Sequence, residues 1–392
     1  MNFIFISPNF PQTYWNFCDR LRRRGVNVLG IGDGPLSEPL SRSLTEYYRV
    51  DSMENYPDMY RGVAYFAWKY GKIDWIESNN EYWLETDARL RTDFHVTTGV
   101  DLAGIEKFKS KAAQKKYYAK GNIPTALQAK VTTLEAARAF LKEVGYPVIV
   151  KPEVGVGAAA TYKVSDDSQL EAFFATRPDV PYVMEEFITG DIYSYDAVCD
   201  SHSRPLFESS AHFPPSVMDI VNKHLDMDYY VLPEVPAELK RLGRATLKAF
   251  GVKSRFVHFE FFRLTKDRKS NGRTGDFVGL ETNMRPAGGY TPDMMNFAHS
   301  TDVYDIWADM IVSDSRLLPE SGDDHFCAYY GRRSDRTYLH SHEEVMARYG
   351  SVMAMQDRIP AALAPDLGDI MYMVHLRTED QLKEFNAFLS ER

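Results

Sequence analysis

The sequence predicts a multidomain protein of mixed α/β and α+β class that begins with a doubly wound parallel sheet. Three observations support this class. The first hundred residues alternate between apolar strand-like runs and helical stretches, which is the pattern of a parallel sheet covered by helices. Two later β-like runs flank the polar turn KDRKSNGRTG and are typical of a hairpin. The length of 392 residues is sufficient for two or three domains.

The elements expected in the first domain follow one another regularly. The expected strands cover 3–7, 26–32, 47–50 and 73–78, and the expected helices cover 12–24, 58–70 and a stretch from about Glu81. The first strand is followed by SPNFPQT and not by a GxGxxG turn, which argues against a dinucleotide site there. Later helices are expected over 111–120, 236–250 and 379–390.

Composition and charge exclude several classes of function. The net charge of −9 and the lack of a long basic run argue against a nucleic-acid partner. No apolar run approaches the roughly 20 residues of a membrane span, and the segment MNFIFIS does not look like a targeting signal. Three widely spaced cysteines form neither a disulfide framework nor a CxxC metal site. We therefore expect a cytoplasmic protein without a membrane partner.

The hairpin carries polar residues in a pattern that favours a metal–phosphate site. Alternate side chains of a strand share a face, so His258 and Glu260 point one way on the first strand. Glu281, Asn283 and Arg285 line one face of the second strand. Two carboxylates and an amide oxygen form a hard, all-oxygen pocket that suits Mg²⁺, and the arginine supplies a fork for phosphate or carboxylate oxygens.

A solvated strand face with cross-strand ion pairs is the alternative interpretation of the same residues. The apolar setting argues against it, because Glu260 lies among four phenylalanines and Glu281 follows the run FVGL. Carboxylates embedded in apolar strands are costly unless a cation or a donor meets them.

A second motif favours phosphate binding further upstream. Lys151 ends the apolar strand PVIVK and precedes the loop EVGVGAAA, which contains Gly155 and Gly157. Small residues leave successive backbone N–H groups accessible, so such a loop can close over phosphates. A tight packing turn is the alternative interpretation of the loop.

Taken together, these motifs resemble the ATP-grasp superfamily from about residue 105 to residue 310. Lys111 matches the first ATP lysine of that family, with Lys109 and Lys115 as rivals, and Lys151 matches the second. The family hinge that holds adenine matches VMEEFITG, that is, Glu185, Glu186, Phe187 and Ile188. The family's Mg²⁺ ligands match Glu260, Glu281 and Asn283, and its arginine beside the transferred phosphoryl group matches Arg285.

The sequence departs from the family at the ribose contact. Ile192 stands where the family usually has an acidic residue, and Asp191 is the candidate replacement. The loop at 155–160 also carries alanines where glycine or serine is more common, which keeps the N–H groups but loses serine hydroxyls.

The resemblance implies an ATP- and Mg²⁺-dependent ligase, with Mn²⁺ as an alternative ion. Such an enzyme activates a small-molecule carboxylate as an acyl phosphate and joins it to an amine, releasing ADP and phosphate. Two alternatives stay open: a bicarbonate-activating enzyme similar to carbamoyl-phosphate synthase, and a nucleotide-binding regulatory protein without ligase activity. The sequence does not determine the oligomeric state, and a homodimer is one candidate assembly.

Two further residues are weaker candidates. His258 is interpreted as a proton acceptor for the amine, as a partner of the metal site, or as a buried histidine with its hydrogen bonds satisfied. Glu81 follows a strand end, where ligands of open α/β sheets gather, so it is a candidate for a substrate ammonium or a helix-start carboxylate. The expected domains are an N-terminal α/β domain (1–105), a lid subdomain (106–190), a large sheet subdomain (191–314) and a C-terminal α/β appendage (315–392).

Overall fold

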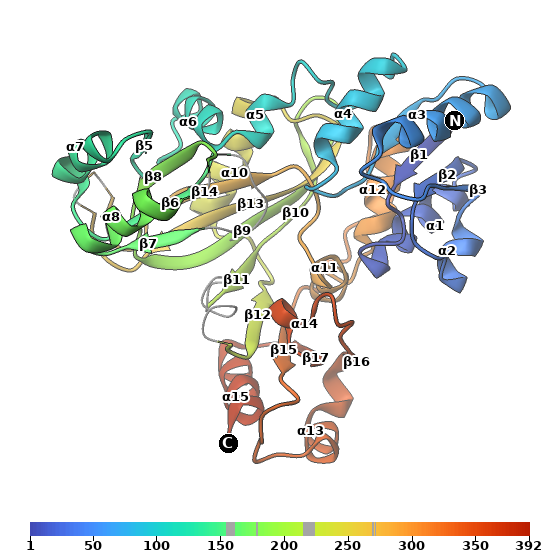
Figure 1. The fold of residues 1–392 in the computed structure, drawn as a ribbon. Helices are drawn as coiled ribbons and strands as arrows, with labels where there is room; N and C mark the ends of the chain where they lie inside the picture. The colour runs from blue at the N-terminus through green and yellow to red at the C-terminus, as the bar shows by residue number, and fades with distance from the viewer. Residues whose placement is uncertain (154–160, 178, 215–223, 269, 271) are drawn as a thin grey trace.

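The structure is a computed structural model that describes residues 1–153, 161–177, 179–214, 224–268, 270 and 272–392. Figure 1 shows three regions around a long central sheet: the N-terminal domain, a lid formed by the middle of the chain, and a C-terminal block. None of the helices in these ranges combines the length and the apolar character that a membrane span requires.

The N-terminal domain is a four-stranded parallel sheet in the order β3-β2-β1-β4. Its strands are β1 (Asn2–Ile6), β2 (Asn27–Gly32), β3 (Glu46–Arg49) and β4 (Trp75–Glu77). Its helices are η1 (Gln12–Tyr14, a 3-10 helix), α1 (Trp15–Arg23), α2 (Glu38–Ser43), α3 (Tyr56–Tyr70) and α4 (Leu84–Asp93). Phe5 packs on one face of the sheet with Phe17, while Ile4 packs on the other with Phe66. Both faces are thus covered, which confirms the doubly wound prediction.

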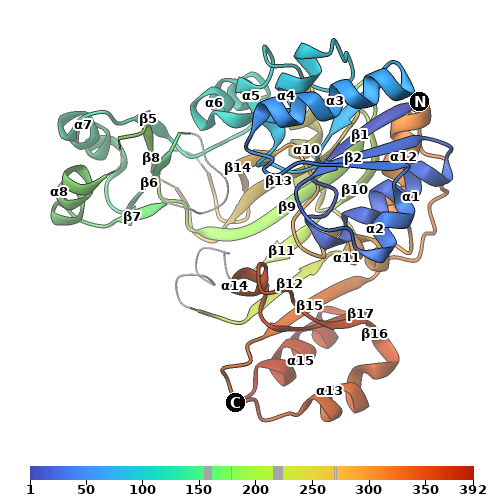
Figure 2. The ribbon, with the colours of Figure 1, turned by 45° about the vertical axis from the view of Figure 1, so that its right-hand side comes forward.

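The lid is a four-stranded antiparallel sheet in the order β5-β8-β6-β7. Its strands are β5 (Gln128–Lys130), β6 (Val148–Pro152), β7 (Tyr162–Val164) and β8 (Tyr182–Glu186), and its helices are α7 (Leu134–Val144) and α8 (Asp167–Thr176). Apolar residues of both helices and of the sheet form a separate core, which includes Phe140, Val150 and Leu170. The lid therefore has a core of its own at the far end of the molecule in Figures 1 and 2.

The large sheet has nine strands in the order β14-β13-β9-β11-β12-β15-β17-β16, and β10 pairs with β9. Its first strands are β9 (Gly190–Cys199), β10 (Pro205–Ser209), β11 (Ala211–Phe213), β12 (Met227–Val231), β13 (Arg255–Leu264) and β14 (Phe277–Asn283). The helices of this part are α5 (Glu106–Lys109), α6 (Lys111–Lys120), α10 (Ala237–Phe250), α11 (Thr291–Ala298) and α12 (Val303–Ser313). Phe259 and Phe261 of β13 pack with Leu242 of α10, so α10 covers what we call the back face; His258 and Glu260 lie on the opposite, front face.

The C-terminal block continues the large sheet through the pairing of β12 with β15. It contains β15 (Phe326–Arg332), α13 (His342–Tyr349), the 3-10 helix η2 (Gly350–Val352), β16 (Met353–Arg358), α14 (Ala364–Leu367), β17 (Ile370–Leu376) and α15 (Glu379–Ser390). Val345 of α13 and Phe385 of α15 share a small core with the strands. The expected terminal helix is confirmed, and the strands of this block share one sheet with β13 and β14.

Two local expectations need comment. The helix expected from about Glu81 begins at Leu84, so Glu81 lies in the preceding turn, outside the first helical turn. The expected boundary between the lid and the large sheet subdomain, at residue 190, falls at the start of β9, since β8 belongs to the lid sheet and β9 to the large sheet. Residues 187–189 are therefore the direct link between the two sheets.

Candidate functional site

The two carboxylates predicted as metal ligands lie directly opposite each other. β13 and β14 are antiparallel, and their register pairs Glu260 with Glu281 and His258 with Asn283. Directly opposed residues of an antiparallel pair point to the same face of the sheet. The predicted hairpin is therefore confirmed, and the three predicted oxygen ligands converge on the front face.

A β-bulge places Glu281 on that face. Phe261 pairs with Gly279, while its neighbour Glu260 pairs with Glu281, so Leu280 is an extra residue in β14. In a strand that kept Leu280 but had no bulge, strict alternation would put Glu281 on the same face as Phe277, which packs in the core of the back face. Bulges of this kind re-aim side chains beside functional sites.

His258 is buried and both of its ring nitrogens contact carboxylates. Nδ1 lies 2.7 Å from Oδ1 of Asp196, on the neighbouring strand β9, and Nε2 lies 3.2 Å from Oε1 of Glu260. Burial lowers the pKa of His258, but the charge and hydrogen bond of Asp196 and the hydrogen bond to Glu260 outweigh it and raise the pKa to about 9. A protonated ring donates both hydrogen bonds, so the geometry favours a satisfied histidine that holds Glu260 over a proton acceptor.

The donor set fits a hard divalent cation. Burial alone would raise the pKa of Glu260, but His258, Arg285 and Lys151 together lower it, so the carboxylate is ionised. The side chains of Glu260 and Glu281 are 26% and 24% exposed, which leaves their oxygens accessible. Asn283 is only 4% exposed, and its Nδ2 has no hydrogen-bond partner among the described residues. Two carboxylates and an amide are ligands that Mg²⁺ accepts.

The second ATP lysine candidate lies in the lid beside the hinge glutamate. Nζ of Lys151 is 2.6 Å from Oε2 of Glu185, and Nζ of Lys115 is 3.2 Å from Oε1. Burial would raise the pKa of Glu185, but Lys151 and Lys115 lower it to about 2. Burial lowers the pKa of Lys115 despite this contact, because one carboxylate serves two lysines. The cluster is thus a buried patch with excess positive charge, which suits an anionic ligand.

The three candidates for the first lysine occupy different places. Lys111 lies 3.6 Å from Oε1 of Glu281, at the hairpin. Lys115 lies at Glu185, and its Nζ also donates to the carbonyl of Ala126 at 2.9 Å. The positive charge of Lys109 acts to lower the pKa of the Glu81 carboxyl. Helix α6 thus presents Lys111 to the metal candidate and Lys115 to the hinge.

The remaining hinge residues divide into polar and apolar roles. The carboxylate of Glu186 is bound by Arg268, whose Nη2 donates at 2.7 Å, and by the Ser270 hydroxyl at 2.8 Å. The carboxylate of Glu186 therefore already has hydrogen-bond partners within the protein. Ile188 is buried in an apolar cluster with Ala126, Phe262, Leu264 and Val278 on the front face, whereas the ring of Phe187 lies 4.2 Å from Nζ of Lys163. An apolar wall at Ile188 is suited to the face of a purine ring.

Of the remaining predicted site residues, Arg285 acts on the front-face cluster, whereas Asp191 lies on the other face. The charge of Arg285 acts on Glu260 and Glu81, and its Nη1 donates to the carbonyl of Pro286 at 2.8 Å. Asp191 pairs with Arg263, which follows the alternation of the back face, so the structure does not bring Asp191 to the front-face cluster. Gly155 and Gly157 lie outside the described residues.

Sequence reasoning missed a buried ionic network that joins the N-terminal domain to the hairpin. Glu77, at the end of β4, accepts from Arg91 at 2.9 Å and from Arg255, at the start of β13. Nη1 of Arg255 also donates at 3.0 Å to the carbonyl of Met284, the residue before Arg285. A glutamate inside the apolar run IDWIES was the signal, since such a residue needs a cationic partner. The network fixes the end of β4 beside Arg285.

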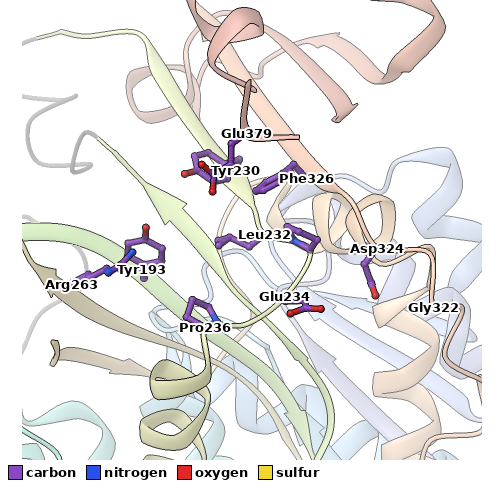
Figure 3. A pocket seen from close by; sticks show the side chains of 11 residues that line it. Tyr193, Tyr230, Leu232, Glu234, Pro236, Arg263, Gly322, Asp324, Phe326 and Glu379 are labelled. Carbon is purple, nitrogen blue, oxygen red and sulfur yellow. The ribbon is translucent and has the colours of Figure 1, made fainter. Parts of the chain in front are cut away.

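A cavity of about 450 Å³ lies away from these residues. Figure 3 shows Tyr193 and Arg263 on one side of it and Tyr230, Phe326 and Glu379 on the other. Tyr193 and Arg263 are on the back face, so the cavity opens opposite Glu260. Cavity volume therefore does not locate the charged cluster, which is identified by its side chains.

Comparisons with known proteins identify the fold. Residues 108–213 match the model of an ATP-grasp domain. Three solved structures are similar along almost the whole chain. An L-amino acid ligase from Bacillus licheniformis is 15% identical, with a TM-score of 0.72, and the match covers 99% of this chain and 96% of that one. A phosphoribosylglycinamide synthetase from Anaerococcus prevotii is 14% identical, with a TM-score of 0.69 and coverages of 99% and 97%.

The third is the biotin carboxylase domain of a 2-oxoglutarate carboxylase from Hydrogenobacter thermophilus, in complex with MgADP, ADP and bicarbonate. It is 13% identical, with a TM-score of 0.68, and the match covers 98% of this chain and 88% of that one. The chain therefore has the ATP-grasp fold and contains an ATP-grasp domain, as the resemblance of the sequence implied. Its fold is one shared by proteins that are named ligases, synthetases and carboxylases.

Proposed function

We propose that this protein is an ATP- and Mg²⁺-dependent ligase that activates a small-molecule carboxylate and joins it to an amine. The observation that carries the proposal is the opposed pair Glu260 and Glu281 on the front face, with Asn283 beside it and Lys111 at 3.6 Å from Glu281. The names of the similar structures support the same class, since two of them are a ligase and a synthetase.

Each group of residues has a proposed task. Glu260, Glu281 and Asn283 would hold Mg²⁺, which would supply positive charge to neutralise the phosphate oxygens of ATP. Lys151 and one lysine of α6 bind the phosphate tail, and the apolar wall at Ile188 contacts adenine. His258, held by Asp196, keeps Glu260 in place. Most of the catalysis is positioning, which can supply roughly 7–11 kcal/mol of the barrier.

The reaction follows from these positions. An oxygen of the substrate carboxylate attacks the γ-phosphorus of ATP, the bond from that phosphorus to the bridging oxygen breaks, and ADP leaves. Arg285 stabilises the negative charge on the transferred group. The nitrogen of a neutral amine then attacks the acyl carbon, phosphate leaves, and the amine loses a proton. The amide, ADP and phosphate are the products.

Phosphate release from ATP and Mg²⁺ tests the proposal. The assay uses amino acids, hydroxy acids and bicarbonate, each alone and paired with an amine, with the wild type and Glu281→Gln. We expect release only with an acid, product formation only with the pair, and a loss of at least roughly a hundredfold in the variant, because one ligand charge is removed.

Two results would count against the proposal. Release driven by bicarbonate alone would move the protein to the carbamoyl-phosphate-synthase-like alternative. ATP binding without release for any acid, in a wild type whose melting temperature rises with MgATP, would favour a nucleotide-binding regulatory protein.

A further inference from the structure

The segment after β4 is a rigid turn at the carboxyl end of a parallel strand. Oε1 of Glu77 accepts from the backbone N–H groups of Ser78 and Asn79 at 3.1 and 3.2 Å. The Ser78 hydroxyl donates to Asp87 of α4 at 2.6 Å, and the Tyr14 hydroxyl donates to the carbonyl of Asn79 at 2.6 Å. Asn79 has a φ of +52°, in the left-handed region, so these contacts hold the backbone in an uncommon conformation.

Two buried polar groups of this turn have no hydrogen-bond partner in the described part of the chain. Glu81 is 8% exposed and Asn79 is 1% exposed. Among the described residues, no hydrogen bond reaches Oε2 of Glu81 or Nδ2 of Asn79. Buried polar groups in a folded protein are nearly always hydrogen-bonded, so two unpartnered groups in one turn indicate a site for a ligand. A helix-start role does not account for Glu81, because α4 begins at Leu84.

The turn lies against the metal–phosphate cluster. Arg255 contacts Glu77 at the start of the turn and the carbonyl of Met284 next to Arg285, which brings the two segments together. Burial raises the pKa of the Glu81 carboxyl, and the negative charge of Glu281 adds to this effect, whereas the positive charges of Arg285, Lys109 and Arg255 oppose it. Glu81 is therefore a carboxyl group near the arginine proposed to stabilise the transferred group.

We propose that Glu81 binds an ammonium group carried by the carboxylate substrate, so that the acid this protein activates is an amino acid. The inference rests on the proposed function and names its substrate class. One end of such a molecule places its carboxylate at Arg285, and the other places its ammonium at Glu81, where a charge-assisted hydrogen bond satisfies Oε2. Nδ2 of Asn79 can donate to an oxygen of the same molecule.

The ammonium belongs to the activated acid and not to the attacking amine. An amine must be neutral to attack the acyl carbon, whereas a neighbouring carboxylate favours the charged ammonium form. Glu81 would therefore hinder the nucleophile but suits an ammonium that does not react. The Glu81 carboxylate would also discriminate against a substrate analogue that lacks the ammonium group, because binding such an analogue would leave Glu81 buried and unpaired.

Hydroxylamine separates the acid from the unknown amine, because it converts an acyl phosphate to a hydroxamate. The protein is incubated with ATP, Mg²⁺ and hydroxylamine, together with each of the common L-amino acids, and the best acid is compared with its 2-hydroxy and unsubstituted analogues. The same comparison is made for Glu81→Gln and for the control Glu85→Gln, an exposed residue of the same segment. Hydroxamate, phosphate and the KM for ATP are measured.

We expect an amino acid to be used at least roughly tenfold better than its 2-hydroxy analogue. Glu81→Gln is expected to raise the KM for the amino acid by about 10- to 100-fold and to abolish this preference, while the KM for ATP stays within about twofold. Glu85→Gln should match the wild type. The unchanged KM for ATP shows that Glu81→Gln is folded.

Other outcomes overturn the inference in distinguishable ways. Equal use of the 2-hydroxy analogue, or a KM for the amino acid that Glu81→Gln leaves unchanged, would reject the role of Glu81 and leave the ligase proposal intact. Phosphate release with bicarbonate or with acids that lack nitrogen, and none with amino acids, would reject the amino-acid substrate. The absence of both hydroxamate and phosphate release with every acid would reject both the inference and the proposed function.

Discussion

Two groups of acidic residues in this protein have similar composition and different chemistry. Asp200, His202 and Asp314 offer three ligand atoms within 4.8 Å of one another, close enough for a metal ion. Their oxygens are already used. Asp200 accepts from the N–H groups of His202 and Arg204 at 2.8 and 2.9 Å, and Asp314 accepts from the N–H and hydroxyl of Ser201 at 2.7 and 2.6 Å.

The pair Glu260 and Glu281 is the opposite case. His258 lies 3.2 Å from Glu260 and Lys111 lies 3.6 Å from Glu281, and no backbone N–H of the described residues donates to either carboxylate. Strand alternation places the carboxylates of Glu260 and Glu281 side by side without using up their capacity to accept hydrogen bonds. The comparison shows that proximity does not identify a metal site; unused acceptor capacity on a rigid element does. Asp200 and Asp314 instead tie a loop to the end of α12.

The largest expected difference between the two groups is in activity. Glu260→Gln should lower ATP-dependent phosphate release by at least roughly a thousandfold, about 4 kcal/mol in the barrier, because it removes the negative charge of a metal ligand that also accepts from His258. Asp314→Asn should leave release within about twofold of the wild type. Steady-state assays of the two variants at saturating Mg²⁺ check this, and an equal loss in both would erase the distinction.

The next expected effect is a pH dependence of stability that belongs to the Glu260 group. The pKa of His258 is about 9 in the folded protein, above its usual value of 6.5, so its protonation stabilises the fold. This contribution is fully present below pH 6.5 and is lost as the pH rises through 9; it is on the order of 3 kcal/mol. Urea unfolding in EDTA from pH 6 to pH 10 measures it. His258→Gln should flatten the profile between pH 6.5 and 9, and an unchanged profile would contradict the assignment.

The smallest expected effect concerns the hydrogen bonds that connect Asp314 to the loop at Ser201. Asp314→Asn should reduce the free energy of unfolding by about 1 kcal/mol, since it weakens two hydrogen bonds from Ser201. Because these oxygens are satisfied by the protein, we expect no additional change when Mg²⁺ is varied. Thermal unfolding of the variant with and without Mg²⁺ tests both statements, and a Mg²⁺-dependent stabilisation of the wild type that Asp314→Asn removes would show a second metal site.

Local patterns predicted the parts of the fold that depend on nearby residues. The helix at 111–120 and the terminal helix at 379–390 have the expected bounds. The hairpin was predictable because alternation and a polar turn are encoded within about 30 residues. The same short-range pattern is sufficient to predict that Glu260 and Glu281 lie on neighbouring strands.

Contacts between residues far apart in the sequence determine the features that local patterns do not predict. No local signal indicates that β12 joins the C-terminal strands to the sheet of the hairpin. Asp196 was missed for the same reason, since its contact with His258 spans 62 positions. Asp191 was chosen for its place after the hinge, whereas the register of β9 with β13 determines which way it points.

The extra residue Leu280 changes which alternate positions of β14 face the front. Before the bulge these are even-numbered positions such as Val278, and after it they are odd-numbered positions such as Glu281. Strict alternation counted from either half of the strand therefore assigns the other half to the wrong face. Replacing Leu280 by another residue would leave this offset in place, because the offset depends on the number of residues in the strand and not on their chemical type.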